Sequence, residues 1–115
     1  MRRIIRLCQS TIGLKAIVAV TGSGRTAMLI SARRPSVPLF AFAPDPAVRR
    51  RVAFMWGVVA HPVKPIRDPD RLIEWIVRYL SNEGRLKAKD RVVVSFGSPI
   101  WEEGTKTNSL RIVVV

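Results

Sequence analysis

The chain has 115 residues, the size of a single domain, and 48% of them are hydrophobic, which excludes global disorder. No apolar run is long enough to span a membrane, and the single cysteine, Cys8, excludes an intrachain disulfide and a cysteine-based metal cage. The net charge of +12 points to an anionic partner. The first residues lack the continuous apolar stretch of a signal peptide, so we expect a cytoplasmic protein with no membrane partner.

The first third of the chain is predicted to form a helix, a buried strand and a second helix. Residues 2–12 have the apolar spacing of a helix, and Gly13 follows in the position typical of a C-cap. Residues 16–20 are a continuous apolar run, as expected for a strand that is buried on both faces. A turn over residues 21–24 then leads into a helix over residues 25–33.

The same strand–turn–helix unit follows a second time. Residues 37–42 are predicted to be a short strand. Asp45 is a suitable N-cap and Pro46 fits the first helical position, so a helix is expected from there to about residue 54. A third strand is expected over residues 57–60.

A proline-rich connection over residues 61–69 precedes the longest helix of the chain. This helix is predicted to begin at Asp68 or Asp70 and to end near Asn82, because apolar residues recur there with helical spacing.

The last part of the chain contains two more strands, over residues 91–96 and 110–115, joined by a loop over residues 97–108. Strands that alternate with helices indicate βαβ units and a parallel sheet. The last connection has no room for a crossover helix, so the fifth strand is expected to be antiparallel. The sequence therefore predicts one α/β domain over residues 1–115, a three-layer αβα sandwich with a five-stranded, mostly parallel sheet.

The turn after the first predicted strand has the composition of an anion-binding site. Its glycines are expected to free backbone N–H groups for a ligand, its hydroxyls add donors, and the following helix contributes the positive end of its dipole. It does not match a Walker P-loop or a complete Rossmann fingerprint. An ordinary βα turn, in which a Ser or Thr caps the helix, remains the alternative. The candidate residues are Thr21, Gly22, Ser23, Gly24, Arg25 and Thr26.

The 97–108 loop is the second candidate binding segment. Ligands of open α/β sheets bind beyond the carboxyl ends of the strands, and this loop and the turn at residues 21–26 both follow such ends. Hydroxyl groups and a lysine suit a second anionic group, and a tryptophan suits stacking on a ligand or a subunit contact. A solvated hairpin connection is the alternative. The candidate residues are Ser98, Trp101, Gly104, Thr105, Lys106 and Thr107.

The sequence does not favour catalysis. The eight acidic residues are scattered, and no pair stands at metal-ligand spacing with a histidine. The only histidine, His61, follows a predicted strand and has no evident partner, so we expect a structural or solvent-facing role. We expect no catalytic residue, no metal site and no cofactor in this chain.

Two further groups of residues have simple structural explanations. Arg49, Arg50 and Arg51 are expected at the C-terminal turn of a helix, where the helix dipole favours positive charge, although a nucleic-acid or interface patch is the alternative. Trp75 and Tyr79 are four residues apart and are expected to pack on the longest helix rather than to stack on bases.

Several segments taken together resemble the C-terminal, effector-binding domain of pyruvate kinase. The turn of that family reads Thr-x-Ser-Gly-Arg-Ser/Thr-Ala, and Thr21 to Ala27 of this chain read TGSGRTA. The similar segments, in chain order, are residues 16–27, 30–35, 38–44, 56–58, 84–94 and 104–114.

The resemblance implies a five-stranded α/β domain with an allosteric role in a glycolytic enzyme. In the family, this domain binds a phosphorylated effector and packs against a symmetry mate in a tetramer. Carried over, the turn would hold one phosphate through Thr21, Ser23, Gly24 and Thr26, and the 97–108 loop would close over the ligand. Gly22 stands where several members have lysine, so one charge of the family's turn is missing here.

The resemblance also implies that the chain alone is not an enzyme, because the family's phosphoryl transfer takes place in a separate barrel domain. The leading interpretation is a regulatory domain that binds a phosphorylated effector, or inorganic phosphate or sulfate, and contacts a second copy or a barrel partner. A subunit-interaction domain with a vestigial ligand site is the first alternative. A basic nucleic-acid-binding protein is the second and is less favoured, because the 15 arginines are scattered along the chain.

Overall fold

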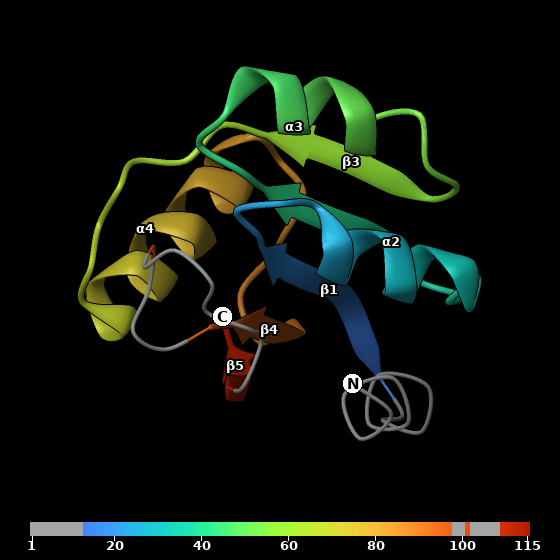
Figure 1. Ribbon diagram of the computed structural model, residues 1–115. Coiled ribbons are helices and arrows are strands. Elements are labelled where there is room, and N and C mark those ends of the chain that lie inside the picture. The colour runs from blue at the N-terminus through green and yellow to red at the C-terminus, as the bar shows by residue number, and fades with distance from the viewer. Residues whose placement is uncertain (1–12, 98–100, 102–108) are drawn as a thin grey trace.

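A computed structural model describes residues 13–97, 101 and 109–115 (Figure 1). The helix predicted over residues 2–12 lies outside the described residues. Eight elements follow in chain order: β1 (Leu14–Val20), α2 (Arg25–Ala32), β2 (Leu39–Phe42), α3 (Pro46–Val52), β3 (Val58–His61), α4 (Pro69–Asn82), β4 (Arg91–Phe96) and β5 (Ser109–Val114).

The five strands form one sheet in the order β3-β2-β1-β4-β5. β3, β2, β1 and β4 are parallel to one another, and β5 pairs with β4 in the antiparallel sense. The register places Ile17 beside Leu39 of β2 on one side and beside Val93 of β4 on the other. The predicted mostly parallel sheet with an antiparallel last strand is therefore confirmed.

Helices cover both faces of this sheet. On β1, the alternating side chains of Ala16, Val18 and Val20 pack in the cluster that contains the buried face of α4. Those of Ile17 and Ala19 pack on the opposite face, with residues of α2 and α3. In Figure 1, α4 lies at the left of the sheet and α2 at the right. The apolar run of β1 is continuous because both of its faces are buried.

The helix starts follow the sequence closely. Asp45 accepts a hydrogen bond from the Ala47 amide at 2.9 Å, and Pro46 is the first residue of α3. At α4 the N-cap is Asp68, whose carboxylate accepts from the Asp70 amide at 3.2 Å. Asp68, rather than Asp70, is thus the start signal of the longest helix.

Some predicted bounds are wrong by up to two residues. The second strand begins at Leu39, although the carbonyl of Pro38 still accepts from the Ile17 amide at 3.0 Å. α3 ends at Val52 rather than near residue 54. β3 extends to His61, which pairs with Phe42 and so belongs to the sheet.

The topology places a switch point at the centre of the sheet. The chain runs from β1 outward to β2 and β3, then returns past them through α4 to β4 on the other side of β1. The carboxyl ends of β1 and β4 are adjacent there, and ligands of open α/β sheets bind at such points. Thr21 follows β1 and Gly97 follows β4, so both candidate segments begin at the switch point. Over the described residues, no helix has the length and apolar character to cross a membrane.

Candidate functional site

The 21–26 turn joins β1 to α2 and packs tightly beneath α3. Gly24 has φ +89°, and a Cβ placed there would lie 2.9 Å from Cγ1 of Val52 and 3.4 Å from Cγ1 of Val48. Glycine is therefore required at this position, both by the backbone conformation and by the approach of α3. Gly22 differs, because its φ is ordinary and a Cβ there would meet nothing within 4 Å.

Two of the turn's amides are occupied by the turn's own hydroxyls. The Gly24 amide donates to Thr21 Oγ1 at 2.8 Å in a buried hydrogen bond. The expectation that both glycines offer free N–H groups is thus wrong for Gly24, whose amide points back into the turn. The Arg25 amide donates to Ser23 Oγ at 3.3 Å in an exposed hydrogen bond.

Three residues of the turn, Gly22, Ser23 and Arg25, face solvent. Gly22 and Ser23 are exposed, and within the described ranges no acceptor is bonded to their amides. Arg25 is exposed at the first position of α2, and the first turn of that helix has no acidic residue. Thr26 follows and is buried. The N-cap of α2 is Gly24 and has no side-chain cap, whereas the hydroxyls of Thr21 and Ser23 accept from the amides of Gly24 and Arg25, which are contacts that the alternative of an ordinary turn capped by Ser or Thr also predicts.

Arginines from α3 reach the carbonyls around this turn. Nη2 of Arg51 donates to the Ser23 carbonyl at 2.9 Å. Nη1 of Arg49 donates to the carbonyls of Ala43 and Pro44, at 2.8 and 2.9 Å, in the turn after β2. The sequence places these arginines correctly in the last turn of α3. Their spacing alone gave no sign that Arg51 reaches the 21–26 turn, because only the packing of α3 over Gly24 brings them together.

The 97–108 loop is described at Gly97 and Trp101, whereas Ser98, Gly104, Thr105, Lys106 and Thr107 lie outside the described residues. Nε1 of Trp101 donates to the Ile66 carbonyl at 3.0 Å, and its ring packs against the apolar cluster on the α4 face. In this structure Trp101 therefore contacts the protein's own core.

His61 has a partner that the sequence did not predict. Its Nδ1 lies 3.3 Å from the Tyr79 hydroxyl, and its ring stacks on Phe42. Its buried Nε2 has no hydrogen-bond partner within the part of the chain that the structure describes. Burial, and then the positive charge of Arg85, lower the pKa of His61 below its usual 6.5, while Glu83 opposes the shift. The prediction of packing for Trp75 and Tyr79 is confirmed, since both rest on the core.

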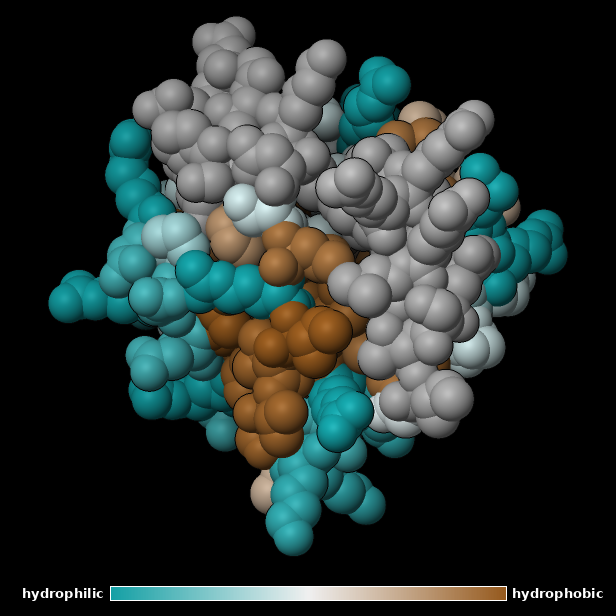
Figure 2. Space-filling view, turned by 90° about the horizontal axis from the view of Figure 1, so that it is seen from below, coloured by the Kyte–Doolittle hydropathy of each residue, from teal (hydrophilic) through white to brown (hydrophobic). Residues whose placement is uncertain are grey.

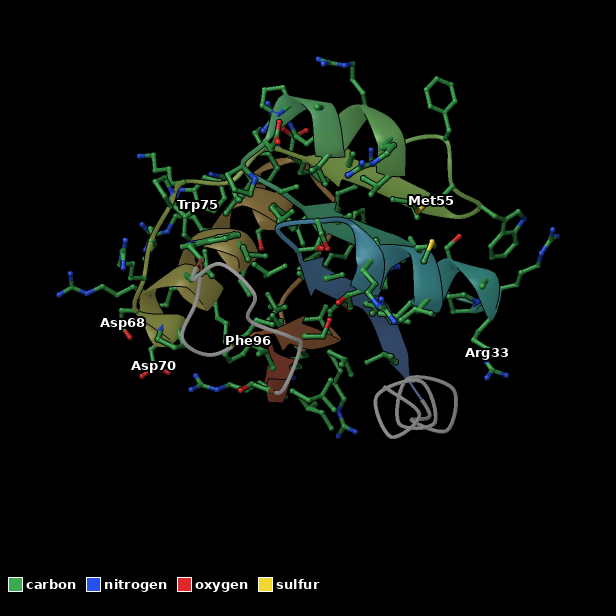
Figure 3. All side chains as sticks on the ribbon, viewed as in Figure 1. Arg33, Met55, Asp68, Asp70, Trp75 and Phe96 are labelled. Carbon is green, nitrogen blue, oxygen red and sulfur yellow. The ribbon has the colours of Figure 1, made fainter. Side chains whose placement is uncertain are left out.

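The acidic groups at the start of α4 lie apart from the 21–26 turn. Asp68 and Asp70 stand at the start of the helix (Figure 3). Asp70 pairs with Arg111 and Asp68 with Arg71, the latter at 3.7 Å. Over the described residues, no three His, Cys, Asp or Glu side chains are grouped so as to hold a metal ion.

An apolar surface lies along the edge strand β5. Ile112 is 50% exposed and Val114 is 61% exposed. Figure 2, which looks at the molecule from below the view of Figure 1, shows apolar side chains gathered on the face where β5 lies. A groove of about 460 Å³ runs between α4 and the end of β5; its lining residues include Ile73, Val77 and Val113.

Comparisons with known proteins give one consistent result. The family model described as pyruvate kinase, alpha/beta domain, matches residues 4–113. A pyruvate kinase of Geobacillus stearothermophilus is 33% identical over 100 residues, which cover 87% of this chain and 17% of the relative. A pyruvate kinase of Lactobacillus delbrueckii subsp. bulgaricus is 30% identical over 112 residues, which cover 97% of this chain and 19% of the relative. The chain thus spans about a fifth of the length of these relatives.

Solved structures of pyruvate kinase share the fold. A Cryptosporidium parvum pyruvate kinase aligns with a TM-score of 0.77 at 25% identity, over 90% of this chain and 19% of that protein. The same organism's pyruvate kinase in complex with ADP aligns with a TM-score of 0.83 at 23% identity, over 97% of this chain and 23% of that protein.

Proposed function

The chain belongs to the pyruvate kinase alpha/beta domain family, and from that premise we propose that it is a regulatory domain whose 21–26 turn binds the phosphate of a phosphorylated effector. The kinase activity named for the relatives belongs to proteins about five times as long, so the proposal concerns ligand binding and subunit contact.

One observation carries this proposal: Gly22 and Ser23 are exposed at the switch point of the sheet, directly before the N-terminus of α2, and within the described residues no acceptor is bonded to their amides. Backbone N–H groups at a helix N-terminus attract anions, and the helix dipole adds about 0.3–1 kcal/mol. The absence of acidic residues from the first turn of α2 removes the usual competitor for this position.

The turn's own hydrogen bonds are compatible with ligand binding to different degrees. The bond between Ser23 Oγ and the Arg25 amide is long and exposed. A phosphate oxygen can therefore take the place of Ser23 Oγ as acceptor, and the Ser23 hydroxyl and the Arg25 amide can then both donate to the phosphate. The bond between Thr21 Oγ1 and the Gly24 amide is short and buried, so we expect it to persist. In this proposal Thr21 shapes the turn and the buried Thr26 supports it from the first turn of α2, while Ser23 and Arg25 face the phosphate together with the amides of Gly22 and Ser23. The 97–108 loop is proposed to cover the ligand.

A titration of the 115-residue chain with inorganic phosphate, followed by the amide resonances of residues 21–26, tests the assignment. We expect saturable shifts of the Gly22, Ser23 and Arg25 amides at low ionic strength. Ser23→Ala should weaken binding several-fold, because it removes a hydroxyl donor to the anion. A screen of sugar phosphates and nucleotides by thermal shift then identifies the effector class. If no anion shifted these resonances or stabilised the chain, the regulatory proposal would be wrong.

We also propose that β5 mediates contact with a second copy of the chain or with a barrel partner. The support is the exposed apolar edge at Ile112 and Val114, since an unpaired edge strand offers backbone groups as well as apolar area. This observation also favours the alternative function, a subunit-interaction domain with a vestigial ligand site. Sedimentation with and without phosphate separates the two, because association without any phosphate binding supports the alternative.

A further inference from the structure

The 21–26 turn contains an exposed carbonyl in the place where an anion is proposed to bind. The Ser23 carbonyl accepts from Nη2 of Arg51 at 2.9 Å, while the N–H of the same peptide unit, on Gly24, donates to Thr21 Oγ1 at 2.8 Å. The peptide between Ser23 and Gly24 is therefore held at both ends. Without Arg51, the negative end of this peptide dipole would repel a phosphate group nearby.

The Arg51 guanidinium keeps its charge available at this position. Its hydrogen-bond partner is a neutral carbonyl, and the ion pairs of the described residues join other arginines to aspartates. A guanidinium has five N–H donors in a planar fork that matches phosphate oxygens, so donors remain after the bond to Ser23. Arg51 thus brings both a positive charge and unused donors to the exposed residue Ser23, next to Gly22.

The position of Arg51 is fixed by packing. Val48 and Val52, on the buried face of α3, are the side chains that a Cβ at Gly24 would touch. Because α3 rests directly on the turn, the residue before Val52 is held next to Ser23. Arg50, one residue earlier, is exposed and has no hydrogen bond to the turn, and Arg49 is bonded to the carbonyls after β2.

From this geometry we infer that Arg51 is a positioning and specificity-determining residue of the proposed phosphate site, supplying from α3 the positive charge that Gly22 does not supply from the turn itself. The inference rests on the proposed function and concerns a phosphate group, free or carried by a monoester. It assigns to one arginine of α3 a role that its two neighbours do not share.

Isothermal titration of the 115-residue chain with inorganic phosphate at low ionic strength tests this role. Arg51→Gln removes the charge and keeps a polar side chain, and we expect the Kd to rise about fivefold, in keeping with an exposed charge-assisted contact. Arg50→Gln is the matched control, since it makes the same change of net charge on the same helix turn. We expect its Kd to change less than about twofold.

Two further variants separate charge from packing. In Gly22→Lys/Arg51→Gln, a lysine enters open space at a position of ordinary φ, and we expect the affinity to return to within about twofold of the wild type. Arg51→Lys retains the charge, and we expect it to bind nearly as well as the wild type. If Arg51 only supported the fold, adding a positive charge at position 22 would not restore the phosphate affinity lost in Arg51→Gln.

The outcomes are distinguishable. If the two Gln variants bind phosphate equally, the effect is one of net charge and the role of Arg51 is overturned, while the proposed function stands. If the lysine at position 22 restores nothing, or if Arg51→Lys is as weak as Arg51→Gln, the charge assignment is wrong. If the wild type binds no phosphate, the proposed function fails, and the inference fails with it.

Discussion

His61 is enclosed by aromatic rings, and its Nε2 has no hydrogen-bond partner among the residues that the structure describes. Phe42 stacks on it, and the Tyr79 hydroxyl meets its Nδ1 at 3.3 Å. The charged groups that act on it are Arg85, which disfavours the imidazolium, and Glu83, which favours it. With burial as the largest cause, the folded protein favours the neutral ring, and the pKa lies below that of the unfolded chain.

This arrangement predicts acid sensitivity. A lowered pKa in the folded state means that the unfolded chain binds the proton more readily, so His61's contribution to stability is present above pH of about 6.5 and is lost as the pH falls through the lower, folded pKa. Urea denaturation between pH 7.5 and about 5 should show this loss, and His61→Phe should reduce it. His61 is the only histidine of the chain. If the free energy of unfolding fell with pH as steeply in His61→Phe as in the wild type, His61 would not be the cause of the acid sensitivity.

The two glycines of the 21–26 turn are expected to respond differently to substitution. Gly24→Ala forces a Cβ to 2.9 Å from Val52 at φ +89°, so we expect the free energy of unfolding to fall by about 1–3 kcal/mol. Gly22→Ala meets open space at an ordinary φ and should change it by less than about 0.5 kcal/mol. Urea denaturation of the pair measures the difference. Equal losses would contradict the close contact of Gly24 with α3.

The difference between these two glycines could not be predicted from the sequence. Gly22 and Gly24 are equivalent in the sequence of a glycine-rich turn, and both suggested free amides. Gly24 is instead fixed by α3, which lies 24 residues or more along the chain, at Val48 and Val52. The same packing creates the contact of Arg51 with Ser23. Such contacts depend on the relative placement of elements, which local patterns do not contain.

At the scale of elements, the start of α4 offers a direct test of capping. Asp68 accepts from the Asp70 amide, and its ion pair with Arg71 is exposed and contributes little. We expect Asp68→Ala to lower the free energy of unfolding by about 1 kcal/mol. Glu74→Ala, an exposed position on the same helix, is the control and should cost less than about 0.5 kcal/mol. Equal effects would show that the cap contributes nothing.

The order and type of the described elements were predictable because their signals are local. A doubly buried strand such as β1 is a continuous apolar run, and Asp–Pro marks the start of both α3 and α4. The end of β3 was not predictable in the same way. His61 belongs to the strand through its pairing with Phe42 and through the bond from the Ala43 amide to its carbonyl at 3.2 Å. Neither partner is near it in the sequence.

For the whole molecule, net charge and exposed apolar area have opposite effects on self-association. Two copies that carry a net charge of +12 each repel one another, whereas the edge strand β5 presents apolar side chains to a partner. Salt screens the repulsion and leaves the apolar contact in place. Phosphate binding should depend on salt in the opposite way to self-association. Salt weakens the attraction of an anion to exposed amides and arginines, so the affinity for phosphate should fall as the salt concentration rises.

These opposite dependences lead to a prediction for self-association. In sedimentation velocity, we expect the chain to associate more strongly as the salt concentration rises. Ile112→Lys should shift it to monomer, since it places a charge on the proposed contact surface. Met28→Lys makes the same kind of change at a 48% exposed site on α2 and should leave the association unchanged. If both variants weaken it alike, β5 is not the contact, and if salt weakens it, the contact is electrostatic and the apolar edge does not drive it.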